Sequence, residues 1–210
     1  MVKTLYLIRH GATLNDGVKR YKGSIDVPLS EEGIEQIKKV SLYLGQRLKD
    51  QKPVVYSSPL SRALRSAEII SQVFNLKPVI VPELRERNFG IWEGMSFDEI
   101  KERYPEEFSL WASNPLRYSP PQGESTIEVR DRVMKALKWI LQPSDSSLQP
   151  DIIVVAHGGV NRIILCELLG ISLENIFRIE QDHGCLNIIE FHDDFPVVRL
   201  INGVCRDEKE

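Results

Sequence analysis

Short aliphatic runs alternate with longer segments of helical periodicity, and this alternation constrains the fold more than any other feature of the chain. Strands are expected at Thr4–Ile8, Val54–Ser57, Val79–Val81, Ile152–Ala156, Leu186–Phe191 and Val197–Ile201. The run at 152–156 lacks polar residues, as a strand buried on both faces requires. Strands alternating with helices predict a three-layer α/β/α sandwich with a mainly parallel central sheet, in which one strand of the closing pair is antiparallel.

The expected helices carry their own boundary signals. Ser30 is a favourable N-cap for a helix with one apolar face, and Pro59 suits the first turn of the next helix. Residues 97–112 read as helical with a break at Pro105. Further helices are expected at 124–141 and at 159–169, the latter ending at Gly170.

Length and composition favour one compact domain over residues 1–210, with a cover segment around 90–123. The chain has 210 residues, and its 42% hydrophobic content is too high for a disordered chain. A pI near 5.9 argues against a general nucleic-acid binder. No apolar run approaches the ~20 residues that cross a bilayer. Three cysteines without CxxC spacing indicate a reducing cytoplasm, and the start of the chain does not read as a signal peptide.

Chemically active side chains follow several of the expected strands. In an open α/β sheet, ligands bind beyond the carboxyl ends of the strands. The residues expected at that edge are Arg9 and His10 after the first strand, Ser57, Ser58 and Arg62 after the second, Glu83, Arg85, Glu86 and Arg87 after the third, and His157, Gly158 and Gly159 after the run at 152–156. Each alone has a structural explanation, such as a surface cation or a turn glycine, but together they predict a site.

Two guanidinium groups and two imidazoles form a positive pocket that matches phosphate oxygens. Neighbouring cations lower the pKa of a histidine, which keeps its ring neutral and nucleophilic. A carboxylate opposite can protonate a leaving oxygen and then activate water. The residue set therefore predicts phosphomonoester chemistry on a small phosphorylated metabolite, without a metal or cofactor.

An ordered series of motifs runs through the chain: Leu7-Ile8-Arg9-His10-Gly11, Leu29-Ser30-Glu31-Glu32-Gly33, Tyr56-Ser57-Ser58-Pro59-Leu60-Ser61-Arg62-Ala63, Leu84-Arg85-Glu86, Gly90-Ile91-Trp92-Glu93-Gly94, Gly123-Glu124-Ser125 and Val155-Ala156-His157-Gly158-Gly159. In this order the sequence resembles the histidine phosphatase superfamily, in the branch that includes cofactor-dependent phosphoglycerate mutases and related phosphatases.

The resemblance implies a role for each matching residue. His10 corresponds to the phosphorylated nucleophile, Arg9 and Arg62 to the ligands of the phosphoryl oxygens, His157 to a stabiliser of the transition state, and Glu86 to the proton donor. Thr13, Lys22 and Gly23 fall where the family lines its substrate pocket, and Gly158 corresponds to a backbone amide donor. One departure is Asp16, where relatives commonly place Asn; Asn15 precedes it.

The mutases of this family resemble the chain less well, because they have a longer insertion where this chain has the short segment from Glu86 to Gly123. The resemblance therefore implies a phosphatase rather than a mutase. The stretch from Gly170 to Asn187 resembles α-ribazole-5′-phosphate phosphatases of cobalamin assembly, and phosphoserine phosphatases share much of it. Trp111, Tyr118, Pro120 and Pro121 are expected in the cover, either stacking on a flat base or packing among themselves. The oligomeric state stays open between monomer and homodimer.

Two other classes are weighed. A metallohydrolase would use some of His10, His157, His183 and His192 with Asp182, Asp193 or Asp194, but neither HxH nor HExxH spacing occurs. A non-catalytic module that binds a phosphorylated ligand on the same fold would be expected to lack a catalytic residue, and all are present. A dinucleotide-binding domain is disfavoured because no GxGxxG follows a strand.

Overall fold

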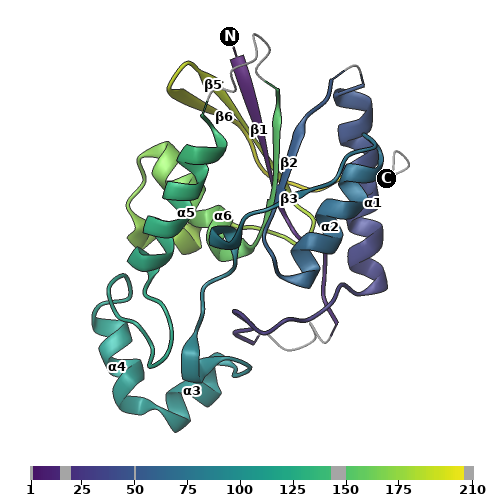
Figure 1. Ribbon diagram of the computed structural model, residues 1–210. Helices are drawn as coiled ribbons and strands as arrows, with labels where there is room; N and C mark the ends of the chain where they lie inside the picture. The colour runs from purple at the N-terminus through teal and green to yellow at the C-terminus, as the bar shows by residue number, and fades with distance from the viewer. Residues whose placement is uncertain (1, 15–19, 50, 143–149, 206–210) are drawn as a thin grey trace.

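The fold is taken from a computed structural model that describes residues 2–14, 20–49, 51–142 and 150–205. One six-stranded sheet forms its centre, in the order β3-β2-β4-β1-β5-β6 (Figure 1). The strands are β1 (Val2–Arg9), β2 (Val54–Ser57), β3 (Val79–Ile80), β4 (Ile152–Ala156), β5 (Leu186–His192) and β6 (Phe195–Gly203). The pairs β1–β4, β4–β2 and β2–β3 are parallel, whereas β5 is antiparallel to both β1 and β6. The predicted sheet with one antiparallel strand is confirmed.

Strand β4 lies at the centre of the parallel part, and all five of its residues are buried. It pairs with β1 on one side and with β2 on the other. Its alternate side chains enter two different apolar clusters: Ile153 and Val155 pack on one face of the sheet, and Ile152, Val154 and Ala156 on the other. This double burial is the physical reason for the absence of polar residues in the strand.

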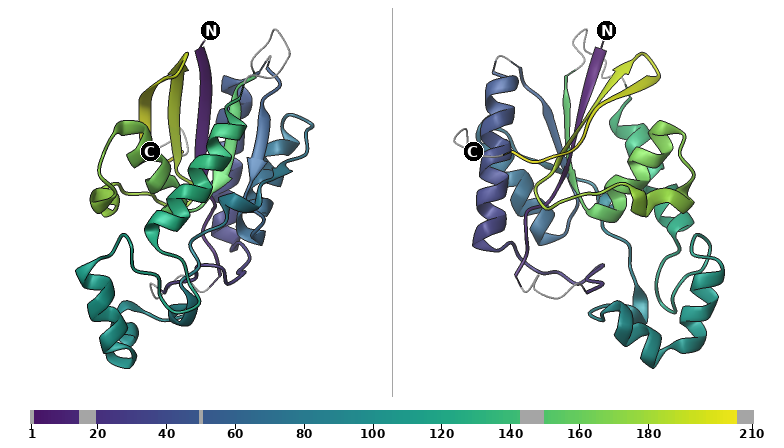
Figure 2. Two further views of the ribbon diagram at one scale, coloured as in Figure 1. Left: turned by 60° about the vertical axis from the view of Figure 1, so that its left-hand side comes forward. Right: turned by 180° about the vertical axis from the view of Figure 1, so that it is seen from behind.

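Helices cover both faces of the sheet, which gives three layers (Figure 2). Helices α1 (Glu31–Arg47) and α2 (Ser61–Gln72) lie on one face, and α5 (Thr126–Ile140) and α6 (Gly158–Leu169) on the other. The Ser30 side chain accepts from the Gly33 amide as the N-cap of α1. Gly170 ends α6 in the left-handed region, at φ 66°, as predicted.

One predicted helix boundary is wrong. Pro59 was expected in the first turn of a helix, but α2 begins at Ser61 with Leu60 as its N-cap residue. The Ser58 hydroxyl accepts from the amide of Leu60, which keeps the chain in a turn before the helix starts. Proline at this place therefore shapes the approach to the helix.

The cover segment lies beyond the carboxyl ends of the parallel strands, at the lower end of Figure 1. It contains α3 (Phe97–Arg103) and α4 (Pro105–Ser113), with the predicted break at Pro105 between them. The 3-10 turn η1 (Pro82–Leu84) precedes it, η2 (Gly90–Trp92) lies at its start, and a third, η3 (Leu173–Arg178), follows α6.

Within the described parts of the chain, no helix is both long and apolar enough to span a lipid bilayer. Cys166 and Cys185 are buried free thiols, and Cys205 is half-buried. Burial raises the pKa of the Cys185 thiol to about 11, which keeps it protonated and unreactive at neutral pH.

Candidate active site

Strand register brings the two predicted histidines together. Arg9 pairs with Ala156 across β1 and β4, so His10 and His157 both stand one residue past the pairing. Their rings meet edge to face, with centroids 5.1 Å apart. Ser58 stands one residue past the pairing of Ser57 with Val155 on β2. The carboxyl ends of three parallel strands thus bring the side chains of His10, Ser58 and His157 to the same end of the sheet, as the sequence predicted.

His10 is held in one tautomer by the backbone. Its Nδ1 lies 2.7 Å from the carbonyl oxygen of Gly11. A carbonyl only accepts, so Nδ1 carries the hydrogen and Nε2 of the neutral ring keeps its electron pair. The side chain is only 6% exposed. The arrangement presents a single, oriented nucleophilic nitrogen.

Burial lowers the pKa of His10 well below its usual range, and the nearby His157, Arg9 and Arg62 lower it further. The hydrogen bond to Gly11 acts in the opposite direction but does not prevail. The imidazole is consequently neutral at physiological pH, and the site keeps its positive charge on the two guanidinium groups.

Arg9 and Arg62 are oriented by backbone carbonyls from different loops. The Arg9 Nη1 atom donates to the carbonyl of Gln181 over 2.5 Å. Arg62, buried at 2% exposure, donates from Nη1 to Ile25 O (2.8 Å) and from Nη2 to Gly23 O (2.7 Å). Both charges are close enough to the His10 ring to lower its pKa. They form the predicted positive cradle.

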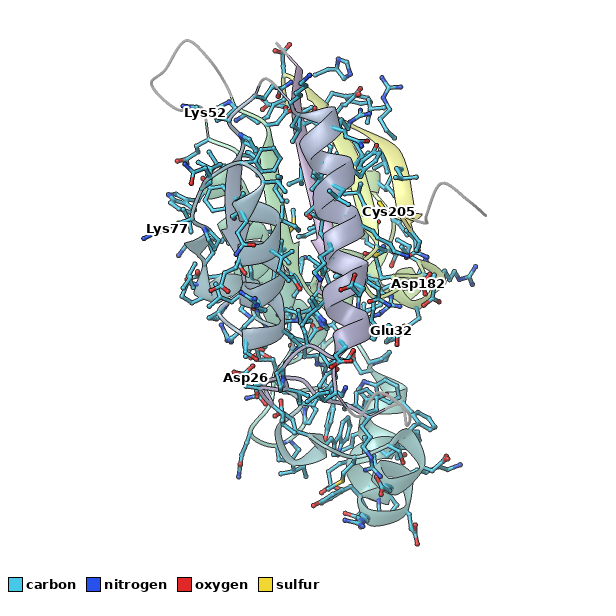
Figure 3. All side chains as sticks on the ribbon, turned by 90° about the vertical axis from the view of Figure 1, so that its right-hand side faces the viewer. Asp26, Glu32, Lys52, Lys77, Asp182 and Cys205 are labelled. Carbon is cyan, nitrogen blue, oxygen red and sulfur yellow. The ribbon has the colours of Figure 1, made fainter. Side chains whose placement is uncertain are left out.

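Asp26 joins the same loop to α2. Its carboxylate accepts from the amide of Ser61, 2.8 Å away, at the start of the helix. Figure 3 shows Asp26 at the cover end of the sheet, with Lys52 at the opposite end. The loop from Gly23 to Asp26 is thereby fixed to the helix that carries Arg62.

His157 is fully buried and is the N-cap residue of α6. Its Nε2 lies 2.7 Å from the Ser58 hydroxyl, which itself accepts from the Leu60 amide. Ser58 can therefore donate to Nε2, and this leaves the hydrogen of the neutral ring on Nδ1. That Nδ1 has no hydrogen-bond partner within the described residues. Burial, followed by Arg62 and Arg9, lowers the pKa of His157 well below its usual range.

Glu86 lies against the first turn of α6. Its Oε2 accepts from the Gly159 amide (3.0 Å), and its Oε1 accepts from the Arg87 amide (2.9 Å). A side chain at position 159 would collide with this carboxylate, since an added Cβ would approach Oε1 to 2.6 Å. The lack of a side chain on Gly159 thus leaves room for the Glu86 carboxylate beside α6, the helix whose N-cap residue is His157.

The remaining residues that were predicted to line the pocket make contacts of their own within the site. Lys22 donates from Nζ to the hydroxyl of the buried Thr13 over 2.6 Å, and Gly23 supplies a carbonyl to Arg62. Gly158 begins α6, where a Cβ would be 3.4 Å from Nε of Arg9. Asn15 and Asp16 lie outside the described residues.

His183 also lies at this site, although the sequence suggested it only as a metal ligand in the metallohydrolase alternative. Its Nε2 accepts a hydrogen bond from Nη2 of Arg9 over 2.6 Å, and its ring centroid lies 5.5 Å from that of His10. The antiparallel pairing of β5 with β1 explains why His183 lies here. Because Leu186 on β5 pairs with Ile8, the residues just before β5 must lie beside the carboxyl end of β1.

The aromatic residues of the cover pack on one another. Trp111 and Tyr118 both contact the buried Trp92, with centroid separations of 6.4 and 6.0 Å. The carbonyls of Pro120 and Pro121 accept from Gly123 and Ile91 in the same segment. Of the two interpretations of these rings, the structure supports internal packing.

Two glycines set how closely α1 approaches the chain that follows His10. A Cβ on Gly11 would collide with the backbone of Gly33, and a Cβ on Gly33 would collide with the backbone of Ala12. The chain after β1 and the first turn of α1 are therefore in direct backbone contact. This contact helps to fix the segment that includes His10.

Across the described residues, no three or more histidine, cysteine or acidic side chains gather in a way that could hold a metal ion. One carboxylate named for the metallohydrolase alternative has a different partner. Asp182 accepts from the amide group of Asn202.

The chain was compared with known proteins. The family model described as histidine phosphatase superfamily (branch 1) matches residues 5–203. Phosphoserine phosphatase 1 of Hydrogenobacter thermophilus is 32% identical over 205 residues, which cover 98% of this chain and 94% of the relative. Adenosylcobalamin/alpha-ribazole phosphatase of Escherichia coli is 30% identical over 199 residues, covering 95% of each chain.

A solved structure agrees with these matches. The crystal structure of the alpha-ribazole phosphatase from Shigella flexneri superimposes with a TM-score of 0.80 at 28% identity. The alignment covers 95% of this chain and 96% of that one. Sequence and fold therefore match over nearly the whole chain.

Proposed function

The chain belongs to branch 1 of the histidine phosphatase superfamily and is a phosphomonoesterase of that family, and from this premise we propose that it acts through a phosphohistidine on His10. The observation that carries the proposal is the neutral His10 ring, with Nδ1 bound to Gly11 and the Nε2 electron pair held among positive charges. Nothing in this arrangement needs a metal or cofactor.

In the first step, His10 Nε2 attacks phosphorus and the bond from phosphorus to the leaving oxygen breaks. Glu86, protonated, gives its proton to that oxygen as the alcohol departs. Arg9 and Arg62 bind the equatorial oxygens, where negative charge resides in such transfers. The Nδ1–H of His157 donates to one of the same oxygens, which gives that buried group its partner.

In the second step, water attacks the phosphohistidine. The Glu86 carboxylate takes a proton from the water, the nitrogen–phosphorus bond breaks, and His10 Nε2 recovers its electron pair as phosphate forms. Glu86 thus ends the cycle protonated, as it began.

The test is a rapid-quench experiment in alkaline detergent with a ³²P-labelled phosphomonoester. We expect protein-bound phosphate that is labile in acid, stable in alkali, and located on His10. With p-nitrophenyl phosphate, whose leaving group needs no proton, the variant Glu86→Gln should accumulate this species during turnover, because water is then poorly activated. Quenched enzyme without phosphate, under conditions where turnover is fast, would overturn the phosphohistidine.

For the substrate, we propose a small phosphomonoester, with phosphoserine as the first compound to test and α-ribazole 5′-phosphate as the second. The names of two relatives supply both compounds. The order follows from the cover, since Trp111 and Tyr118 are already packed on Trp92 and offer less reason to expect stacking on a flat base. The amine and carboxylate of phosphoserine also suit a charged site.

Specificity constants for phosphoserine, α-ribazole 5′-phosphate and 3-phosphoglycerate test this order. We expect phosphoserine to give the highest kcat/KM and phosphate as the product. A higher value for α-ribazole 5′-phosphate would reverse the order. Conversion of 3-phosphoglycerate into its isomer without release of phosphate would instead establish the mutase alternative.

A further inference from the structure

The segment that carries Glu86 has no regular secondary structure of its own. It lies between the turns η1 and η2, in residues 85–89, and is not part of the sheet that positions both catalytic histidines. Yet a proton donor must be held within hydrogen-bond reach of the oxygen that it protonates. Something outside the sheet must therefore position this backbone.

Arg132 on α5 makes the required contacts. It donates from Nη1 to the carbonyls of Glu83 (2.5 Å) and Arg85 (2.8 Å), and from Nη2 to the carbonyl of Glu86 (3.1 Å). Its remaining donors bind the Glu124 carboxylate, from Nε to Oε1 (2.8 Å) and from Nη2 to Oε2 (2.9 Å). A guanidinium group has five N–H donors, and each has an acceptor here.

Glu124 completes the attachment from the other side of Glu86. Its Oε2 accepts from the amide of Asn88 (3.0 Å), and its Oε1 accepts from Nη2 of Arg85 (2.9 Å). The ion pair thus binds the backbone both before and after the proton donor. The positive partners and the Asn88 amide lower the pKa of Glu124 and outweigh its burial, so it remains ionised.

The ion pair is largely buried, with side-chain exposures of 12% for Arg132 and 16% for Glu124. Pairs of this kind contribute little net stability, because desolvation offsets much of their attraction. Positioning is the effect that the geometry explains best. A lysine would keep the charge but offers only three donors on a single atom, so it would release part of the loop.

We propose that Arg132, paired with Glu124, is a positioning residue that holds Glu86 in place to protonate the leaving oxygen. The inference depends on the proposed function, since it assigns Arg132 an effect only through Glu86. Loss of the positioning should affect esters whose alcohol needs a proton to leave, and should spare p-nitrophenyl phosphate, whose leaving group departs without one.

The test compares kcat/KM for an alkyl phosphate, β-glycerophosphate, with that for p-nitrophenyl phosphate in Arg132→Lys, Glu86→Gln and the double variant. We expect Arg132→Lys to lower the ratio of the two constants by about tenfold, which is only part of the roughly 10²–10⁴ that general acid–base catalysis contributes. In the Glu86→Gln background, Arg132→Lys should leave the ratio unchanged. Arg130→Lys is the matched control, because Arg130 is on the same helix and pairs with Asp131.

The outcomes separate the two claims. If Glu86→Gln lowers the ratio and Arg132→Lys lowers both constants equally or neither, the positioning role is overturned and the proton donor stands. If Glu86→Gln leaves the ratio unchanged, the assignment of the proton donor fails, and the positioning role fails with it. If Arg132→Lys does not fold, Glu124→Gln provides the same test, because it weakens the hydrogen bonds that Glu124 accepts from Asn88 and Arg132.

Discussion

The two halves of the site are built in different ways. The half with His10 and His157 is attached to the ends of adjacent parallel strands, and the sheet itself fixes the spacing of the two rings. The half with Glu86 is an irregular segment that depends on side-chain hydrogen bonds from α5 and on a helix amide. Under the proposed mechanism, the core therefore sets phosphate binding, whereas proton transfer depends on a network that can be altered without touching the core.

The largest effect is expected from His10→Ala, which removes the nucleophile from the sheet half. Turnover of every phosphomonoester should fall to the assay background, while the melting temperature stays near that of the wild type. His192→Ala is the control. His192 ends β5 at the opposite end of the strands from His10, and its side chain is 46% exposed. Near-normal hydrolysis by His10→Ala would refute the assignment of the nucleophile.

Arg62→Ala should have the next largest effect. Removing one donor from an oxyanion-binding site typically costs about 10²–10³ in rate, or about 2.7–4 kcal/mol of transition-state stabilisation. The loss should be similar for alkyl and aryl esters, unlike that of Arg132→Lys, because both esters transfer the same phosphoryl group. Arg65→Ala, one turn further along α2 and exposed, is the control. A loss confined to alkyl esters would contradict the division of the site.

The buried neutral histidines predict a pH dependence of stability. Burial lowers the pKa of His157 in the folded protein, so as the pH falls below about 6.5 the unfolded chain takes up a proton that the folded protein excludes. The free energy of unfolding should therefore decrease in acid and level off below the folded pKa. His157→Asn should reduce this slope by about 1.4 kcal/mol per pH unit, measured by urea unfolding between pH 6 and pH 5. An unchanged slope would show that His157 is already protonated in the fold.

The smallest effect is expected from His183→Leu, which removes one of the acceptors that orient Arg9. Arg9 keeps its bond to the Gln181 carbonyl, so a net loss of ~0.5–1.5 kcal/mol, about two- to tenfold in kcat/KM, is reasonable. His183→Asn keeps an acceptor and should restore part of the activity. If the two variants behave alike, the hydrogen bond to Arg9 is not what His183 contributes.

Sequence patterns predicted the sheet half well, for a physical reason. Strand periodicity places β1, β2 and β4, and parallel strands bring their carboxyl ends to one edge, so the juxtaposition of His10 with His157 follows from the pattern alone. The buried run of β4 was predicted with its observed bounds, Ile152–Ala156.

The other half could not be predicted in the same way. The contacts of Arg132 with residues 83–86 join side chain to backbone across 46 to 49 positions, and no periodicity encodes them. His183 was missed because it comes before its strand, at an edge that only the antiparallel register identifies. Pro59 was placed in the wrong turn because the hydroxyl of Ser58 competes locally with the helix start.

The close approach of Gly11 and Gly33 has a consequence for how this protein tolerates change. Gly33 belongs to a surface helix, yet any larger residue there must displace the backbone at Ala12, two residues after the proposed nucleophile His10. A saturation survey scored by phosphate release would therefore report position 33 as though it belonged to the reaction centre. Thermal denaturation of the same variants would show a lowered melting temperature, because the two backbones can no longer pack against each other.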